Sequence, residues 1–176
     1  QPCRLPFSSV YGKGHILSPK DICTLTHIPE LVEAGIDSFK IEGRMKRKEY
    51  SAFVSHVYRK YVNYYLERGR AAFRELVADK ESPLWKDYKK CQDLYNRGGF
   101  CDSYLFERKK SCMIEPKKNG HGGLLIGTVR QAEKGKVSFD LCEDIQYQDV
   151  LEFRNHDGSK EYEYTVKQPM KKGTCV

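Results

Sequence analysis

Apolar side chains between Tyr50 and Tyr65 recur at intervals of three and four positions, the repeat of one face of an α-helix. This pattern predicts one long amphipathic helix over residues 48–69. The positions predicted to face the core are Tyr50, Val54, Val57, Tyr61 and Tyr64, with Phe53, Tyr58, Val62 and Tyr65 widening that face.

The segment before this helix alternates between strand and helix patterns. Residues 15–25 indicate a short strand that enters a helix, with Ser18 and Asp21 as its capping box, and Pro29 opens a second helix. Residues 38–43 then form a predicted strand. Alternating strands and helices are typical of a parallel sheet or barrel, so we expect an α/β fold that is the trailing part of a TIM-like α/β barrel.

The hydrophobic period changes in the second half of the chain. Residues 71–95 are helical in composition with a break at Ser82-Pro83, and residues 97–122 are rich in turn formers. From Leu124 onward, four short runs alternate between apolar and polar positions, which predicts a small antiparallel, barrel-like β module. Its predicted core is Leu125, Val129, Val137, Phe139, Val150 and Leu151. The predicted organisation is a barrel portion with helices over 1–96, a linker over 97–122 and the β module over 123–176.

The positive charge of the chain is concentrated in one segment. Residues 44–70 carry eight cationic side chains against Glu49 and Glu67, a balance of +6 out of a net +7 for all 176 residues. Such a local field indicates an anionic partner, of which nucleic acid is the obvious class; the alternative is a solvated helix face. No apolar run is long enough to cross a bilayer, so no membrane partner is expected.

The cysteines bear on the compartment of the protein. There are seven, scattered and without a Cys-x-x-Cys pair, which argues against a secreted disulfide framework and favours a reducing cytoplasm. The chain begins Gln-Pro-Cys without Met and without a signal-peptide pattern, so we expect a piece of a longer protein. An active site of that protein can then be only partly present.

Glu42 and Arg44 stand where the predicted strand ends. In α/β barrels this edge is where active sites are built, and Gly43 between them allows a sharp turn or a close approach to a ligand. The alternative is structural, with Lys40 or Arg44 pairing with Glu42 to close a barrel rim.

Three further cations, Lys46, Arg47 and Lys48, follow at the predicted start of the long helix. The helix dipole disfavours positive charge there. Such residues are either well solvated or act with the helix N-terminus to hold an anion.

Conventional hydrolase motifs are missing from the sequence. The five histidines show no His-x-x-x-His spacing, and there is no Gly-x-Ser-x-Gly elbow or phosphate-binding glycine-rich loop. The residues therefore argue against a zinc peptidase of that type and against a serine hydrolase.

Three stretches carry a resemblance to a known family: "QPCRLPF", "ILSPKDICTLTHIPELVEAGIDSFKIEGRMKRKEYSAFVSHVYRKYV" and "LYNRGGFCDSYLF". They resemble peptidase family U32, the collagenase-like proteases, over residues 1–106, most specifically around "IDSFKIEGRMK". Residues 122–176 resemble the C-terminal β-barrel extension of that family. The resemblance implies that the chain starts partway through a U32 domain, after its first barrel strands and a cysteine-rich segment.

The family resemblance also implies a chemistry. Several bacterial members, despite the protease name, act as oxygen-independent hydroxylases of transfer RNA, ribosomal RNA or a ubiquinone precursor. They carry an iron–sulfur cluster on four cysteines, and the RNA-modifying branch uses prephenate as the hydroxyl source. Cys3 is the one credible cluster ligand here, and this chain alone cannot bring four thiolates together. The expected site residues are Glu42 and Arg44 for catalysis, and Lys40, Lys46, Arg47 and Lys48 for substrate or RNA.

Three functions remain open at this point. The first is an RNA-directed, cluster-dependent modifying enzyme, which accounts for the basic segment. The second is a peptidase acting on collagen-like peptide chains, and the third is a non-catalytic RNA- or partner-binding fragment. We expect the parent protein to be an enzyme and this piece alone to be inactive.

Overall fold

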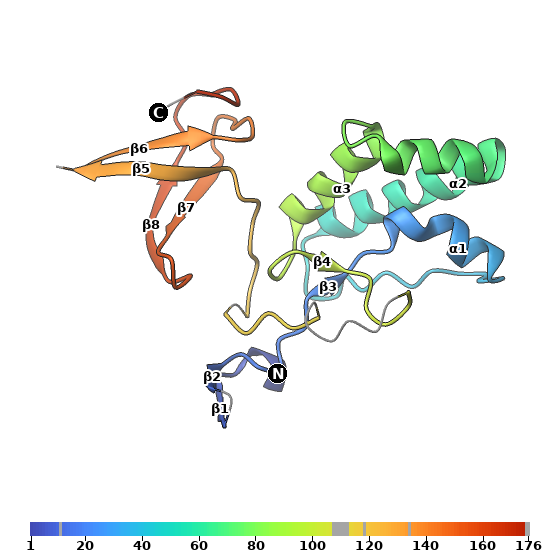
Figure 1. Ribbon diagram of the computed structural model, residues 1–176, viewed down its shortest axis with the longest axis horizontal. Helices are drawn as coiled ribbons and strands as arrows, with labels where there is room; N and C mark the ends of the chain where they lie inside the picture. Colours follow the sequence, from blue (N-terminus) through green and yellow to red (C-terminus); the bar gives the residue numbers. More distant parts are fainter. Residues whose placement is uncertain (11, 107–112, 118, 134, 175–176) are drawn as a thin grey trace. The chain divides into compact units, whose positions relative to one another are not determined.

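The computed structural model describes residues 1–10, 12–106, 113–117, 119–133 and 135–174 (Figure 1). Its contacts divide the chain into two compact units, Gln1–Gly123 and Leu124–Val176, each with its own core. The described residues of the expected linker over 97–122 fall within the first of these units. The mixed α/β class is confirmed, while the described residues form no closed barrel.

Each α-helix described in the first unit lies in a segment that the sequence predicts to be helical. The helices are α1 (Ile28–Glu33), α2 (Lys48–Ala78) and α3 (Pro83–Leu94), with a 3-10 turn η2 (Leu25–His27) before α1. In α2, Gly69 has a φ of +76°, which interrupts the helical geometry. Glycine adopts this conformation without the steric penalty of a side chain, so the predicted helix end marks a kink.

The core of the first unit lies between these helices. Val54, Val57 and Tyr61 are buried on α2, which confirms the predicted apolar face, and Phe73 joins them beyond the kink. The other buried members of this core are Cys23, Leu25, Ile28, Leu84 and Cys91. None of the described helices is long and apolar enough to cross a membrane.

The predicted helix after Ser18 is wrong. Asp21 and Ile22 form the short strand β3 (Asp21–Ile22), which pairs in parallel with β4 (Phe100–Cys101). The reason is long-range pairing: the Glu115 N–H donates to the Ser18 carbonyl at 2.8 Å, which fixes this stretch as extended backbone. A 3-10 turn η1 (Pro2–Arg4) and the antiparallel hairpin of β1 (Phe7–Ser9) and β2 (Gly12–Gly14) precede it.

The predicted strand over residues 38–43 is also wrong, because this segment forms neither strand nor helix. Ile41 packs against the helical core and Phe39 meets the ring of Tyr58 edge to face, at 6.1 Å between centroids. These two side chains anchor the segment, but no described strand lies beside it to complete a hydrogen-bonded ladder. The alternating apolar residues therefore anchor a loop to the core and do not indicate a strand.

The second unit consists of two antiparallel hairpins. β5 (Gly127–Glu133) pairs with β6 (Lys136–Leu141), and β7 (Val150–Arg154) pairs with β8 (Lys160–Thr165), so all four predicted strands are present. In the described residues these hairpins form separate two-stranded sheets. The buried core is Phe139, Leu141, Ile145, Leu151 and Val166.

The predicted core of this β module is only partly correct. Phe139 and Leu151 are buried, but Leu125, Val129, Val137 and Val150 are exposed by 78%, 44%, 38% and 61%. Neighbouring residues of a strand point to opposite faces, so Val150 and Leu151 cannot both face one core. The pairing of β5 with β6 also shifts at Val129/Gln131, which changes the face that later residues present.

Candidate functional site

The turn before α2 sorts the cations of the basic segment into two groups. The Lys46 N–H donates to the Gly43 carbonyl at 2.8 Å, and Arg47 is the extended residue before the helix begins at Lys48. A Cβ at Gly43 would collide with the Ser51 hydroxyl, so a side chain at this position would require that hydroxyl to rotate away. The turn directs Lys46 inward, with its side chain 13% exposed, while Arg47 and Lys48 face solvent.

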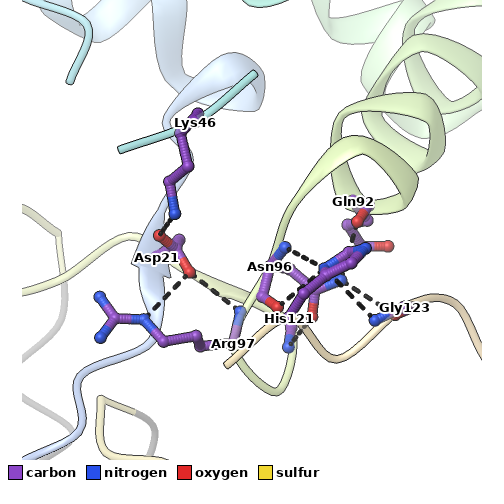
Figure 2. A network of polar contacts seen from close by, with 8 residues as sticks. Asp21, Lys46, Gln92, Asn96, Arg97, His121 and Gly123 are labelled. Carbon is purple, nitrogen blue, oxygen red and sulfur yellow. Dashed lines mark hydrogen bonds and ion pairs between the residues drawn. The ribbon is translucent and has the colours of Figure 1, made fainter. Parts of the chain in front are cut away.

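Lys46 and Arg97 approach the same carboxylate, Asp21 on β3 (Figure 2). The Lys46 Nζ lies 3.9 Å from Asp21 Oδ1, and the Arg97 Nε lies 3.6 Å from Asp21 Oδ2. The backbone N–H of Arg97 donates a hydrogen bond of 2.9 Å to Oδ2. Two cations from distant parts of the sequence thus share one acidic partner.

The surroundings of Lys46 disfavour its positive charge. Burial lowers the pKa of its ammonium group to about 8; Asp21 opposes this effect, and the nearby Arg97 and Arg4 add to it. The ammonium also lies over the ring of Tyr95, with the Tyr50 ring 5.9 Å away. These rings offer the cation only partial compensation for lost water.

The loop that carries Arg97 is fixed by Asn96, which is 2% exposed (Figure 2). Its Nδ2 donates to the carbonyls of Gln92 and Gly123 at 2.8 and 2.9 Å, and its Oδ1 accepts the Gly99 N–H at 2.7 Å. The Asn96 N–H also donates to His121 Nδ1 at 3.2 Å. This network holds the backbone on which the Arg97 guanidinium stands.

Asp21, Lys46 and Arg97 form a buried cluster. Glu42 and Arg44 lie outside it. Glu42 Oε1 pairs with Lys40 Nζ at 3.0 Å, with the two side chains 66% and 86% exposed, and this hydrogen bond lowers the pKa of Glu42. Arg44 is exposed as well. Of the two ion pairs considered from the sequence, the Lys40–Glu42 pair forms, on a solvated loop.

The outward cations give the first unit a basic surface. Lys60 pairs with Asp87, and Arg70 pairs with Glu30 and Glu33. No ion pair joins a described residue to the other exposed cations of the segment, which are Arg44, Arg47, Lys48, Arg59 and Arg68. These five charges are available to an anionic partner.

Cys3 is half-buried, and the thiols of Cys3, Cys23, Cys91, Cys101 and Cys142 are all free. Among the described residues no group of three or more His, Cys, Asp and Glu side chains is placed to hold a metal ion. Burial raises the pKa of Cys23 and raises that of Cys91 to about 12, so neither favours the thiolate that a cluster binds. The described residues therefore do not make up an iron–sulfur site.

Asp21 and Arg97 of the buried cluster, and Asn96 beside it, were not predicted as site residues. Asp21 was interpreted as a helix cap, and Asn96 and Arg97 fell within or beside the expected linker. A signal was present in Asn96-Arg97-Gly98-Gly99, since Gly98 and Gly99 have φ values of +70° and +96° and shape the loop around the Asn96 side chain. Polar residues beside such glycines indicate a loop with a fixed shape, and loops of this kind often carry functional residues.

A family model and an individual relative place this chain in the same protein family. The sequence model of "Peptidase family U32" matches residues 1–115. The chain is 47% identical over 144 residues to "Uncharacterized protease MJ0090" of Methanocaldococcus jannaschii. The matched region covers 78% of this chain and 32% of that protein.

Two shorter matches carry more specific names. The chain is 45% identical over 53 residues to "tRNA hydroxylation protein P2" of Bacillus subtilis, which is 30% of this chain and 17% of that protein. It is 31% identical over 94 residues to "Collagenase" of Porphyromonas gingivalis, which is 53% of this chain and 24% of that protein. The chain thus spans about a third or less of each relative, and no solved structure matches it. With most of the first unit matched, the chain belongs to peptidase family U32.

Proposed function

We propose that this chain is part of an enzyme that hydroxylates transfer or ribosomal RNA without oxygen, and that the basic surface of the first unit contacts the RNA. The observation that carries the proposal is the set of five exposed cations without an ion pair to a described residue, beginning at Arg44 and continuing along α2. Phosphate contacts from such side chains dominate RNA affinity without reading sequence. The similarity to a protein named for tRNA hydroxylation supports the same substrate class.

The second candidate is a peptidase, which the family name and the similarity to a collagenase support. A cysteine peptidase needs a thiolate nucleophile. The two most buried thiols of the helical core, Cys23 and Cys91, have raised pKa values, so burial holds them in the unreactive thiol form. The basic surface has no evident role towards a collagen-like peptide, so we favour RNA.

The iron–sulfur cluster and the hydroxyl donor prephenate belong to the parent protein in this proposal. Cys3 is the ligand that this chain would contribute, and the remaining ligands would come from outside the described residues. The free thiols of the described cysteines support a reducing location such as the cytoplasm. Anaerobic purification of the parent protein tests the cofactor: a protein without iron and sulfide that cleaves gelatin would contradict it.

RNA binding is tested by fluorescence anisotropy with labelled, unmodified transfer RNA across a salt series. Arg47→Ala/Lys48→Ala removes two outward cations, and we expect it to weaken binding and flatten the plot of log K against log salt by about 1.5, since each phosphate contact contributes about 0.7 to 0.9 to the slope. Adding Lys46→Ala should change the slope less, because Lys46 is turned inward.

The matched control is Lys86→Ala/Lys90→Ala, which removes the same charge from exposed positions of α3. It should leave the slope nearly unchanged. Undetectable binding at low salt, or equal losses in the two double variants, would show that the surface around Arg47 and Lys48 is not an RNA site.

A further inference from the structure

The buried cluster of the first unit contains more positive than negative charge. Lys46 and Arg97 face Asp21 at 3.9 and 3.6 Å, both longer than a hydrogen bond. Arg4 is close enough to Lys46 to lower its pKa, together with Arg97. Lys46 and Arg97 therefore share one carboxylate, which leaves a positive charge in excess, and the Lys46 side chain is 13% exposed.

Two guanidinium nitrogens in this region have no hydrogen-bond partner. The Nε atoms of Arg4 and Arg97 are both buried and unsatisfied among the described residues. A buried donor without an acceptor costs free energy, and a charged donor costs more. The two buried Nε–H groups are therefore donors that an acceptor with negative charge would satisfy.

The groups around the cluster hold these cations in position. The Asn96 network fixes the backbone at Arg97, and the Asn119 side chain donates to the Arg4 carbonyl at 3.0 Å. The other acidic group of this region, Glu115, lies against Gly98, and its Oε1 accepts the Lys117 N–H at 3.0 Å. No ion pair links Glu115 to Arg4 or Arg97 in the described part of the chain.

We infer that Arg4, Lys46 and Arg97 form a binding site for a small oxyanion, a carboxylate or a phosphate group, with Asp21 orienting two of the three cations. Guanidinium groups bind both kinds of oxyanion through paired N–H donors. The ammonium of Lys46 adds a point charge and lies over the Tyr95 ring. The site is separate from the outward surface proposed for RNA and does not depend on that proposal.

The test follows the arginine side chains of the 176-residue chain by NMR. Each Arg Nε–Hε group gives its own resonance, and those of Arg4 and Arg97 should shift and saturate when inorganic phosphate or malonate is added at constant ionic strength. Saturation by either anion supports the site, and the tighter of the two identifies the ligand as phosphate or carboxylate. If neither anion moves these two resonances more than those of exposed arginines, the inference is wrong.

Substitutions locate the binding. Lys46→Met and Arg97→Gln should each weaken the bound anion at least about tenfold, since each removes a charged donor. Lys86→Met, which removes an exposed lysine of α3, should leave the affinity unchanged. If Arg97→Gln does not fold, Lys46→Met and Arg4→Gln decide the question. Unchanged affinity in these variants would overturn the inference even where the wild-type chain binds an anion.

Discussion

Replacing Lys46 by Met should stabilise the first unit at neutral pH and lose this advantage in alkali. Burial lowers the pKa of the lysine to about 8 from the ordinary 10.5. The folded protein therefore holds this proton less tightly than the unfolded chain does. Below about pH 8 both states are protonated and the penalty is fully present; between about pH 8 and pH 10.5 the unfolded state holds more protons, so stability rises with pH.

The magnitude follows from the size of this pKa difference. At 1.36 kcal/mol per pKa unit, the fall from 10.5 to about 8 corresponds to an upper limit of about 3 kcal/mol. The lost contacts of Lys46 with Asp21 and the Tyr95 ring reduce the gain, so we expect Lys46→Met to be more stable by about 1–3 kcal/mol near pH 7. Near pH 10.5 this advantage should have fallen by about the full linkage term.

The assay uses Trp85, the single tryptophan of the chain, which packs against the core of the first unit. Its fluorescence in urea titrations reports the unfolding of that unit alone, so the second unit does not complicate the free energy. Partly buried tyrosines with raised pKa values, such as Tyr58 and Tyr88, destabilise both proteins in alkali, and their effect cancels in the difference. Lys86→Met, which removes an exposed lysine of α3, is the control and should leave the stability at neutral pH nearly unchanged. A Lys46→Met difference that is constant across the pH range would refute the reasoning.

Two further predictions concern other parts of the chain. With Glu42 as the catalytic carboxylate of the proposed RNA hydroxylation, Glu42→Gln in the parent protein should lower hydroxylation of transfer RNA, read by mass spectrometry, by orders of magnitude. Its melting temperature should stay unchanged, because the Lys40–Glu42 pair is solvated, and a destabilised but fully active variant would contradict the catalytic role. Residues 124–176 should melt cooperatively on their own, since the unit has its own core. Leu151→Ala should lower its free energy of unfolding, followed by circular dichroism, by about 2–4 kcal/mol, whereas Val150→Ala at the exposed neighbouring position should lower it little. Equal effects would mean that the hairpins do not share this core.

Local sequence patterns predicted those elements whose stability comes from nearby residues. The apolar repeat along α2 is satisfied by a single packed face, and Pro83 begins α3 after the predicted break. The four strands of the second unit were also predicted, because tight hairpins pair residues close in sequence. Which residues of these strands face the core was less predictable, since the irregular pairing at Val129/Gln131 changes which residues turn inward.

Elements that depend on distant residues could not be predicted in this way. Asp21 has a capping pattern around it, but its backbone is extended because it pairs with Phe100, far along the chain. The buried cluster likewise unites Asp21, Lys46 and Arg97, and no periodicity links three such positions. The run Lys46-Arg47-Lys48 was treated as one group, whereas the turn at Gly43 buries the first cation and exposes the other two.

The burial of Lys46 and the exposure of Arg47 and Lys48 determine how the two proposed sites would work together. Exposed cations such as Arg47 and Lys48 are solvated and cost the fold little, but at ordinary ionic strength salt largely screens their attraction for charges more than about 10 Å away. Lys46 and Arg97 are largely withdrawn from water, so their attraction for an anion is screened much less. The surface thus suits a large polyanion that must bind and leave, and the buried cluster suits a small anion that must stay in place. A small charged co-substrate held beside an RNA-binding face requires both properties, and the Gly43 turn places them next to one another in the sequence.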